Sequence, residues 1–583
     1  MLPFIKEQEE YIKNKLLGLG YKIDEVVLNV SSRPELGDYQ FNGIMNLGKE
    51  YHKNPRDIGQ ELVDLIKKDN KYKDINMAGP GFINITFSDE ELIKHINDLN
   101  KNIDLNYKID NPRTIFLDYG GANVAKALHV GHLRSANIGE ALKRLAVSLG
   151  NKAIADAHLG DWGRPIGLVM LEIKKNYPDL QYFDDSYQGE YPKESPVTND
   201  DLMRLYPIAS AKANEDEEYM NEAREITAKF QNGNKGLMAL WHHIMTVSKK
   251  DIKKSYDRLN TTFEVWEGES DCDQYIPEMI EYLEKEKLVE DSQGARIINV
   301  KEDNDDHEVP PLLLVKSNGS HSYETTDLAC IWERMHKWNP DEIWYLTDSR
   351  QALHFEQVFR AAKKAKIVKE DTNLEFIPFG TMNGIDGKPF KTRDGGTMKL
   401  DDLLDLAALE CEKKILPNIT GKEREDVANK VSISAVKYAD LLPYRLTDYI
   451  FDPIKFSDLQ GKTGPYLLYS TIRMKSLIAK AKEEKITYKK INLISDEYQR
   501  NIMISLLNIN SVLNKSFESR SLNDICEHLY KITNTYNNFY YQNRILTEED
   551  KDKRESWLTL TKIVYENNYK LLNILGIDVP ERM

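Results

Sequence analysis

Two histidines three residues apart, His129 and His132, are the first residues whose type and spacing could do chemistry. They lie between an expected strand and an expected helix, where free backbone N–H groups and the helix dipole attract anions. Gly131 has no side chain, which would let a flat adenine ring approach the backbone, and Lys126 adds a positive charge to the same loop. The imidazoles could donate hydrogen bonds to a phosphate as charge builds on it, which suits attack on the α-phosphate of ATP. A metal-binding pair or two surface histidines would show the same spacing.

The elements around these histidines indicate an α/β fold. A short apolar strand is expected over residues 114–119, followed by a loop of small residues at 120–127 and a helix over about 132–149. A second strand at 152–156 completes the strand–loop–helix–strand order that opens a doubly wound, Rossmann-type parallel sheet. Further strands are expected at 312–315, 343–346 and 376–379.

Three regions of different composition predict three domains. Residues 1–105 combine amphipathic helices with short strands and indicate a small N-terminal α+β domain. Residues 106–455 would form the α/β domain, with a polar helical insertion near 172–240. From 456 to 583 glycine is sparse and apolar residues recur at helical spacing, which predicts a C-terminal all-α bundle. The helices expected at the two ends of the chain cover 4–17, 55–67, 427–439, 465–483, 497–513, 524–542 and 554–575.

The composition is that of a globular protein, because 41% of the 583 residues are apolar and 30% are charged. No apolar run reaches the 18 or more residues of a membrane helix, and the acidic N-terminus is unlike a signal peptide. The four cysteines lie far apart and show neither a disulfide framework nor zinc-ligand spacing. We therefore expect a cytosolic chain with reduced thiols, no membrane partner and no dedicated metal ligands. The cysteines are Cys272, Cys330, Cys411 and Cys526.

The longer motif around the histidines resembles a known family. His129-Val-Gly-His132 is similar to the HIGH signature of class I aminoacyl-tRNA synthetases, and the run from Asn123 to Ser135 resembles the arginyl-tRNA synthetases in particular. The resemblance covers nearly the whole chain, and it implies an N-terminal additional domain, a catalytic domain and an anticodon-binding bundle. Four further stretches carry it: Leu36-Gly-Asp-Tyr-Gln40, Ala78-Gly-Pro-Gly-Phe-Ile-Asn84, His158-Leu-Gly-Asp-Trp-Gly163 and Leu575-Gly-Ile-Asp-Val-Pro-Glu-Arg-Met583.

Class I synthetases carry a second signature, the KMSKS loop, whose lysines stabilise the pyrophosphate end of ATP. The corresponding stretch here, residues 384–396, is basic and rich in glycine, which suits a loop that closes on a triphosphate. A proline and a phenylalanine replace the methionine and serine of the signature, so either Lys388 or Lys391 could act. The resemblance implies that Lys126 compensates for such a degenerate loop. Without the resemblance, the stretch would be an ordinary turn-rich surface loop.

The resemblance also implies an arginine pocket. Tyr323 and Asp327 share one face of an expected helix, and the family's arginine-binding helix has a matching tyrosine and aspartate. A carboxylate can bind a guanidinium bidentately. Gln351 matches a substrate-contacting glutamine of the family, and Asn123 would hold the α-amino or carboxylate end of arginine. From the residues alone, a surface Tyr–Asp hydrogen bond and a packing or capping role for the glutamine are the more ordinary interpretations.

The C-terminal region is the expected RNA-binding part. Residues 456–583 hold 19 basic and 16 acidic residues, a net charge of +3, although the whole chain carries −15. The aromatic and amide residues at 530–544 could stack on anticodon bases or form the helix core, and we expect most of them to be core.

The activity implied by the resemblance is arginine–tRNA ligation in two steps. The arginine carboxylate attacks the α-phosphate of ATP to give arginyl-adenylate and pyrophosphate, and arginine is then transferred to the terminal ribose of tRNA(Arg). Mg2+ would accompany ATP through its phosphates, and the family implies a cytoplasmic monomer. One alternative is a different class I synthetase or nucleotidyltransferase, which needs no carboxylate at Asp327. Another is a catalytically silent RNA-binding paralogue, which predicts damaged motifs.

Overall fold

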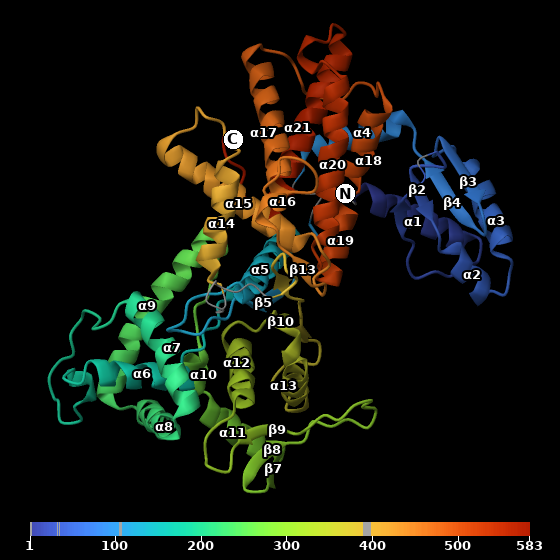
Figure 1. Ribbon diagram of the computed structural model, residues 1–583. Helices are drawn as coiled ribbons and strands as arrows, with labels where there is room; N and C mark the ends of the chain where they lie inside the picture. Colours follow the sequence, from blue (N-terminus) through green and yellow to red (C-terminus); the bar gives the residue numbers. More distant parts are fainter. Residues whose placement is uncertain (1–2, 32, 34, 104–107, 389–397) are drawn as a thin grey trace.

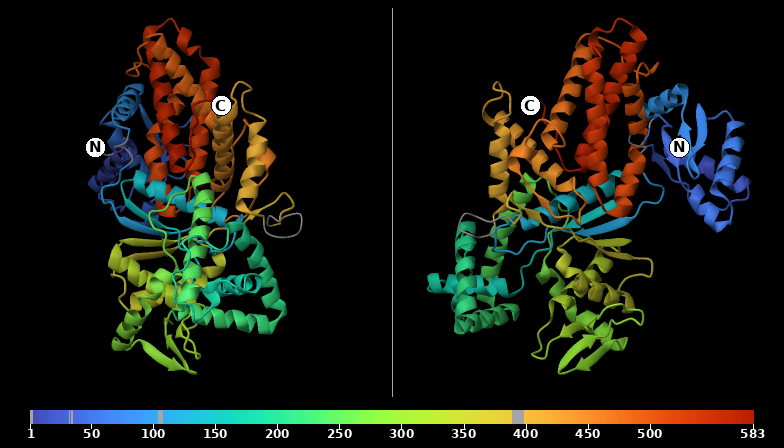
Figure 2. Two further views of the ribbon diagram at one scale, coloured as in Figure 1. Left: turned by 90° about the vertical axis from the view of Figure 1, so that its left-hand side faces the viewer. Right: turned by 45° about the vertical axis from the view of Figure 1, so that its right-hand side comes forward.

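The computed structural model describes residues 3–31, 33, 35–103, 108–388 and 398–583. A parallel sheet lies at the centre, with a tall helical bundle on one side of it and the N-terminal domain beside that bundle (Figure 1). The helical insertion and a small antiparallel sheet extend from the opposite side, as the two further views also show (Figure 2). Lys391 lies outside the described residues.

The central sheet has four parallel strands in the order β11-β10-β5-β6. The chain enters at β5, moves outward to β6, and then returns to the other side of β5 through β10 and β11. The order therefore reverses between β5 and β10, and ligands of open α/β sheets bind at such a point, beyond the carboxyl ends of the strands. This confirms the predicted doubly wound sheet. The strands are β5 (Thr114–Asp118), β6 (Lys152–Asp156), β10 (Glu342–Tyr345) and β11 (Asn373–Phe376).

Two of the expected strands differ in place from the prediction. The run at 312–315 forms β9 (Leu312–Val315), but β9 belongs to a separate antiparallel sheet with β7 (Val289–Ser292) and β8 (Ala295–Ile298). An apolar run predicts a strand without naming its partner. The strand expected at 376–379 ends at Phe376, because Pro378 has no N–H to give to the ladder.

Helices cover the central sheet and form the insertion. Helix α5 follows β5 and carries the predicted histidine motif at its N-terminus, while α7, α8 and α9 pack with α6 around a core that also includes residues of α5, α14 and α15. None of the described helices combines the length and apolar character that crossing a bilayer requires. The helices are α5 (Gly131–Ser148), α6 (Arg164–Asn176), α7 (Asn199–Glu215), α8 (Glu217–Gln231), α9 (Lys235–Arg258), α10 (Glu269–Asp273), α11 (Ile276–Lys285), α12 (Tyr323–Lys337), α13 (Ala352–Lys364), α14 (Leu400–Glu412) and α15 (Gly421–Leu441).

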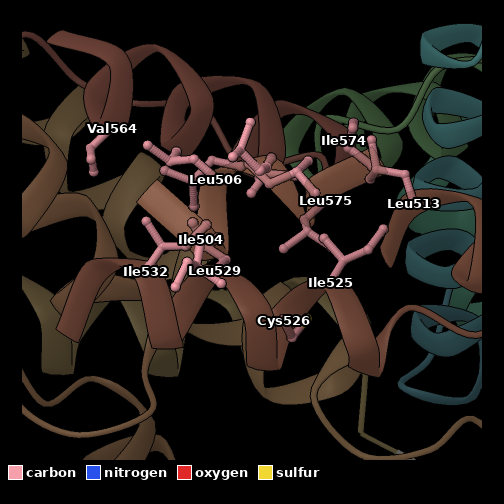
Figure 3. Close-up of a cluster of buried hydrophobic side chains, with 14 of the residues drawn as sticks. Ile504, Leu506, Leu513, Ile525, Cys526, Leu529, Ile532, Val564, Ile574 and Leu575 are labelled. Atoms are coloured by element: carbon pink, nitrogen blue, oxygen red, sulfur yellow. The ribbon is translucent and has the colours of Figure 1, made fainter. Parts of the chain in front are cut away.

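The C-terminal bundle buries a continuous apolar core, in which side chains such as Ile504, Leu529 and Leu575 converge from different helices (Figure 3). Tyr536 and Phe539 are 1% and 0% exposed, so they are core residues. The helix expected at 497–513 divides at residue 508, where the chain turns into a second helix. The helices are α16 (Pro453–Phe456), α17 (Gly464–Glu483), α18 (Glu497–Leu507), α19 (Ile509–Ser519), α20 (Asn523–Gln542) and α21 (Lys551–Ile574), and β12 (Met382–Asn383) pairs with β13 (Tyr449–Ile450) below them.

The N-terminal domain is an antiparallel sheet in the order β1-β2-β4-β3 with helices around it, and it docks on the bundle. Arg500 of α18 donates from Nη2 to Asp38 at 2.8 Å and to the carbonyl of Phe87 at 2.7 Å. Because Asp38 accepts this hydrogen bond, its carboxylate joins the two domains. Asp38 also belongs to one of the stretches that resemble the family, residues 36–40. The elements are α1 (Phe4–Gly18), β1 (Leu28–Val30), β2 (Tyr39–Phe41), α2 (Ile44–Glu50), α3 (Pro55–Lys67), β3 (Asp74–Ala78), β4 (Phe82–Thr86) and α4 (Asp89–Lys101).

Candidate active site

The two histidines of the motif stand together at the N-terminus of α5, with ring centroids 4.0 Å apart. Nδ1 of His129 accepts the Gly131 N–H at 3.0 Å, and Nδ1 of His132 accepts the His129 N–H at 3.1 Å. Nδ1 of His132 also lies 3.2 Å from the His129 carbonyl oxygen, to which a protonated Nδ1 could donate. We assign Nδ1 as an acceptor, because the backbone N–H of His129 then has a hydrogen-bond partner. Burial lowers the pKa of both rings, that of His132 to about 3, so both are neutral at pH 7. Each proton is therefore on Nε2, where it can be donated to a ligand.

Gly131 is required by the ring of His129. A Cβ atom at this position would lie 2.7 Å from Cε1 and 2.8 Å from Nδ1 of His129. The glycine therefore lets the imidazole fold back over the start of α5 and accept the N–H of Gly131 itself. The access for adenine expected from the sequence stays a prediction.

The loop before α5 is held to the ends of two neighbouring strands. Ser135 Oγ accepts the N–H of Gly120 at 2.9 Å and donates to the carbonyl of Leu346 at 2.8 Å, which ties the end of β5 to the end of β10. Ala125 has a positive φ of 60°, an uncommon conformation for a residue with a side chain, and its N–H donates to Ser248 Oγ at 3.0 Å. A network of contacts thus holds a strained loop at the sheet's carboxyl edge.

Two predicted ligands lie on this loop. Asn123 forms a parallel bridge with Gly160, and a Cβ atom at Gly160 would lie 2.3 Å from Oδ1 of Asn123. The amide therefore lies directly over the backbone that follows β6. Nζ of Lys126 lies 4.4 Å from the ring centroid of Tyr206 in α7, so the cation rests on an aromatic face of the insertion.

The segment that follows the Lys388 loop is bonded to the histidine motif. Val130 donates its N–H to Met398 at 3.1 Å, and Leu400 donates to Leu128 at 2.9 Å, so that residue 399 pairs with His129. Lys388 is exposed at the other end, after a turn in which Gly384 donates to its carbonyl at 2.8 Å. The described residues that follow this stretch, 398–400, therefore lie beside His129.

The predicted arginine-binding residues of α12 meet a histidine of α13. Tyr323 is the first residue of the helix and is 62% exposed, while Asp327 is half-buried one turn later. His354 donates from Nε2 to Asp327, and its ring centroid lies 4.8 Å from that of Tyr323. Gln351 is exposed at the end of a short 3-10 turn, one turn before His354. The structure thus places all four side chains at one end of α12 and α13.

Glu269, at the start of α10, is a second carboxylate that sequence reasoning missed. Burial raises its pKa, and among its charged neighbours are His158, Asp161 and Asp327. Two nearby carboxylates can share the two edges of a guanidinium. The sequence around Glu269 could not predict this, because Glu269 approaches Asp327 only through the packing of α10 against α12.

A buried ion network, which sequence reasoning also missed, fixes α12 to the strand ends. Arg334 donates from Nη2 to Asp118 at 2.6 Å and to Asp156 at 3.1 Å, and these aspartates end β5 and β6 in register. Burial alone would lower the pKa of His158, but its contact with Asp156 and the charge of Asp118 raise it to about 9. Arg334 lies seven residues, or two helical turns, after Asp327. This spacing could have predicted that the two side chains share one face of α12.

Two of the cysteines contradict the expectation of unpaired thiols. Cys272 of α10 and Cys330 of α12 are joined by a disulfide, with Cα atoms 5.2 Å apart, whereas Cys411 and Cys526 are free and buried. The pair is 58 residues apart in sequence, and it forms because α10 packs on α12. Sequence spacing could not reveal this packing.

Comparison with known proteins decides the family. Residues 95–453 match the family model described as "tRNA synthetases class I (R), catalytic domain". Residues 6–87 match "Arginyl tRNA synthetase N terminal domain", and residues 467–583 match "DALR anticodon binding domain". The chain belongs to the arginyl-tRNA synthetase family. The resemblance inferred from the sequence motifs is thereby confirmed.

Relatives of this synthetase match it from end to end. It is 43% identical over 99% of both chains to a protein named arginine–tRNA ligase from Alkaliphilus oremlandii. It is 42% identical over 100% of both chains to one of the same name from Agathobacter rectalis.

Solved structures confirm the fold of this synthetase. The arginyl-tRNA synthetase of Plasmodium falciparum superposes with a TM-score of 0.82 at 23% identity, and that of Thermus thermophilus with 0.79 at 20%. Both likenesses cover 100% of each chain. The fold predicted from the sequence, a Rossmann-type parallel-sheet domain with a small N-terminal α+β domain and a C-terminal helical bundle, is confirmed.

Proposed function

We propose that this arginine–tRNA ligase carries out arginine activation at the carboxyl edge of the central sheet, with the histidine motif on one side and α12 on the other. The observation that supports this most is the bonding of Met398–Leu400 to Leu128–Val130. It places residues 398–400, which follow the predicted lysines in the sequence, beside two imidazoles whose Nε2 protons are available. An anion bound at the N-terminus of α5 would therefore meet donors from both segments.

On the arginine side, Asp327 binds the guanidinium, with Glu269 as the second carboxylate. His354 donates a hydrogen bond from Nε2 to Oδ2 of Asp327 and so holds the carboxylate in one orientation. Tyr323 and Gln351 flank the entrance, which fits their exposed side chains. Asn123, placed over Gly160 on the far side, takes the α-amino or carboxylate end, so that the arginine carboxylate points toward the histidines.

On the ATP side, His129 and His132 donate to the α-phosphate as charge develops, and Gly131 leaves room for the His129 ring at the start of α5. Lys126 and one of Lys388 and Lys391 neutralise the β- and γ-phosphates. ATP enters as its Mg2+ complex, in which the phosphates and water supply the ligands. Attack of the arginine carboxylate releases pyrophosphate, and the tRNA ribose then takes the arginyl group from the adenylate.

The three domains divide the remaining work. The bundle, 456–583, binds the anticodon of tRNA(Arg), and the N-terminal domain, 1–105, adds a second tRNA contact beside it. Residues 106–455, with the insertion near 172–240, carry the chemistry. We place the enzyme in the cytoplasm as a monomer, because all the proposed ligands of arginine and ATP come from one chain.

Charging of total bacterial tRNA with each of the twenty amino acids, in the presence of ATP and Mg2+, tests the proposal. We expect arginine alone to be charged, and we expect His129→Ala to lose most of the rate of pyrophosphate exchange. His242→Ala, an exposed histidine on α9, is the matched control and should charge like the wild type. Charging of another amino acid, or a His129→Ala enzyme with unchanged exchange, would contradict the assignment.

A further inference from the structure

The two sulfur atoms of Cys272 and Cys330 lie beside the proposed arginine pocket, and the proposed ligase reaction uses neither of them. Cys330 is one helical turn after Asp327 on α12, and Cys272 is three residues after Glu269 on α10. Sγ of Cys330 is 3.7 Å from Nε2 of His158. The sulfur of Cys330, an imidazole nitrogen of His158 and a carboxylate oxygen of Asp327 all lie within 4.8 Å of one another.

We propose that, when the disulfide is reduced, Cys272, Cys330, His158 and Asp327 form a binding site for a thiophilic divalent cation such as Zn2+. Two sulfurs, one imidazole and one carboxylate are the ligands that a tetrahedral zinc ion takes. A bound ion would occupy the end of the pocket where the guanidinium is proposed to bind.

The separation of one pair of the proposed ligands already fits this ion. With Zn–S near 2.3 Å and Zn–N near 2.05 Å, a sulfur and a nitrogen on one tetrahedral zinc are about 3.6 Å apart. The Cys330–His158 pair already has this separation, at 3.7 Å. Two thiolates on the same ion are about 3.8 Å apart. The sulfurs of Cys272 and Cys330 must therefore move apart once their bond is broken.

The surroundings also support the two ligands other than sulfur. Nδ1 of His158 lies 3.4 Å from Asp156, and a carboxylate on the far ring nitrogen is the usual partner of a metal-bound histidine. His354 holds Oδ2 of Asp327, which leaves Oδ1 for the ion. The side chains of His158 and Asp327 are 14% and 27% exposed, so the cluster can be reached from the pocket.

Reduction of the pair is a balanced step. A water-soluble trialkylphosphine takes the oxygen of one water and becomes its oxide, and the two sulfurs take the two protons of that water as thiols. Binding of Zn2+ then displaces the thiol protons, and any proton on Nε2 of His158 leaves with them. The disulfide form has no thiolate to offer, so the same pair of cysteines switches the site off.

Cobalt absorption tests the site directly. The full-length chain, reduced with the phosphine and kept without oxygen, is titrated with Co2+, which reports thiolate ligands by charge-transfer bands. We expect these bands to saturate at one Co2+ per chain and to disappear when Zn2+ displaces the cobalt. Cys272→Ser and Cys330→Ser should each weaken binding at least about tenfold, while Cys411→Ser, a buried thiol outside the cluster, should bind like the wild type. Reduced wild type without thiolate–cobalt bands, or bands that survive both serine variants, would overturn the proposal.

Two further experiments use the wild-type protein and need no substitution of the proposed zinc ligands. Wild type carrying the disulfide should show no thiolate–cobalt bands, and bands that persist after oxidation would also overturn the site. The competition with arginine rests on the proposed function, so it is measured separately: Zn2+ should raise the KM for arginine without changing kcat, and saturating arginine should displace Co2+. If cobalt binds as expected but arginine leaves it in place, the metal site stands and the assignment of Asp327 to arginine fails.

Discussion

His354 and Asp327 join α13 to α12 at the carboxyl edge of the sheet, through a hydrogen bond from Nε2 to Oδ2. His354 is only 8% exposed and its ring packs at a tilt against Tyr323, with ring centroids 4.8 Å apart, so it can hold the carboxylate in one rotamer. A guanidinium demands such an orientation, because bidentate binding needs both planes aligned. We therefore assign His354 a positioning role for the carboxylate that is proposed to bind arginine.

Replacement of His354 by alanine should weaken arginine binding. A hydrogen bond to a charged group contributes about 1.5–3 kcal/mol, which corresponds to roughly a 10- to 150-fold loss in kcat/KM for arginine. His354→Gln keeps a donor and should lose less. Steady-state kinetics with arginine and with ATP varied separately check this, since the KM for ATP should stay within about twofold. An equal rise in both KM values would show a general loss of structure instead.

Gly131→Ala should disable the histidine motif while leaving the fold intact. The added methyl group would lie 2.7 Å from the ring of His129 and force it away from the N-terminus of α5. Loss of one preorganised donor to a developing charge costs about 10²-fold or more in kcat, which pyrophosphate exchange would measure. Gly18→Ala is the control, because a Cβ atom there meets nothing within 4 Å. Normal exchange by Gly131→Ala would mean that the imidazole position is unimportant.

Local pattern was enough to predict most helices and strands, and it placed several candidate site residues on the right elements. The strand–loop–helix order around His129 and His132 placed the two histidines correctly at a helix N-terminus, because backbone geometry there is a local property. The spacing of Tyr323 and Asp327 likewise placed both on one helix face. The family resemblance supplied their proposed roles, which spacing alone could not.

Residues that act through tertiary packing could not be predicted. Glu269, His354 and the Cys272–Cys330 pair reach the pocket from α10, α12 and α13, and no periodicity relates these segments in sequence. The single helix expected at 497–513 also failed, since the apolar spacing continues through the break at residue 508. The spacing of apolar residues predicts which face of a helix or strand is buried. It does not predict which other helix or strand packs against that face.

Lys437→Met should stabilise the protein, and more so in acid. The amine is fully buried in α15, and burial lowers its pKa to about 7. The unfolded amine keeps its proton up to about pH 10, so the free energy of unfolding of the wild type rises with pH between 7 and 10. Below pH 7 the folded state carries a buried charge that methionine avoids.

The thermal midpoint of Lys437→Met should therefore rise by about 2 °C or more at pH 6 and by less at pH 9. Differential scanning fluorimetry at the two pH values measures this. Lys253→Met, an exposed lysine on α9, should change little at either pH. A gain that is larger at pH 9 would contradict the buried-charge explanation.

Arg500→Ala should loosen the N-terminal domain from the bundle. The substitution removes the hydrogen bonds to Asp38 and Phe87 and leaves the Asp38 carboxylate, 8% exposed, without its cation. Removing one partner of a buried pair costs about 3 kcal/mol, so amide exchange in β4 and α4 should become faster. Arg204→Ala removes an exposed pair on α7 and should leave this exchange unchanged. Equal protection in wild type and Arg500→Ala would show that other contacts suffice.

Asp327 is the residue proposed to select arginine over other amino acids. The decisive measurement is the kcat/KM of tRNA charging with arginine and with its neutral isostere citrulline, for the wild type, Asp327→Asn and the exposed control Asp257→Asn. Loss of one partner of a buried charge pair costs about 2–5 kcal/mol, so Asp327→Asn should lose roughly 30-fold or more with arginine and should narrow the preference over citrulline. The control should match the wild type within about twofold. An Asp327→Asn enzyme that charges arginine normally and still rejects citrulline would contradict the account.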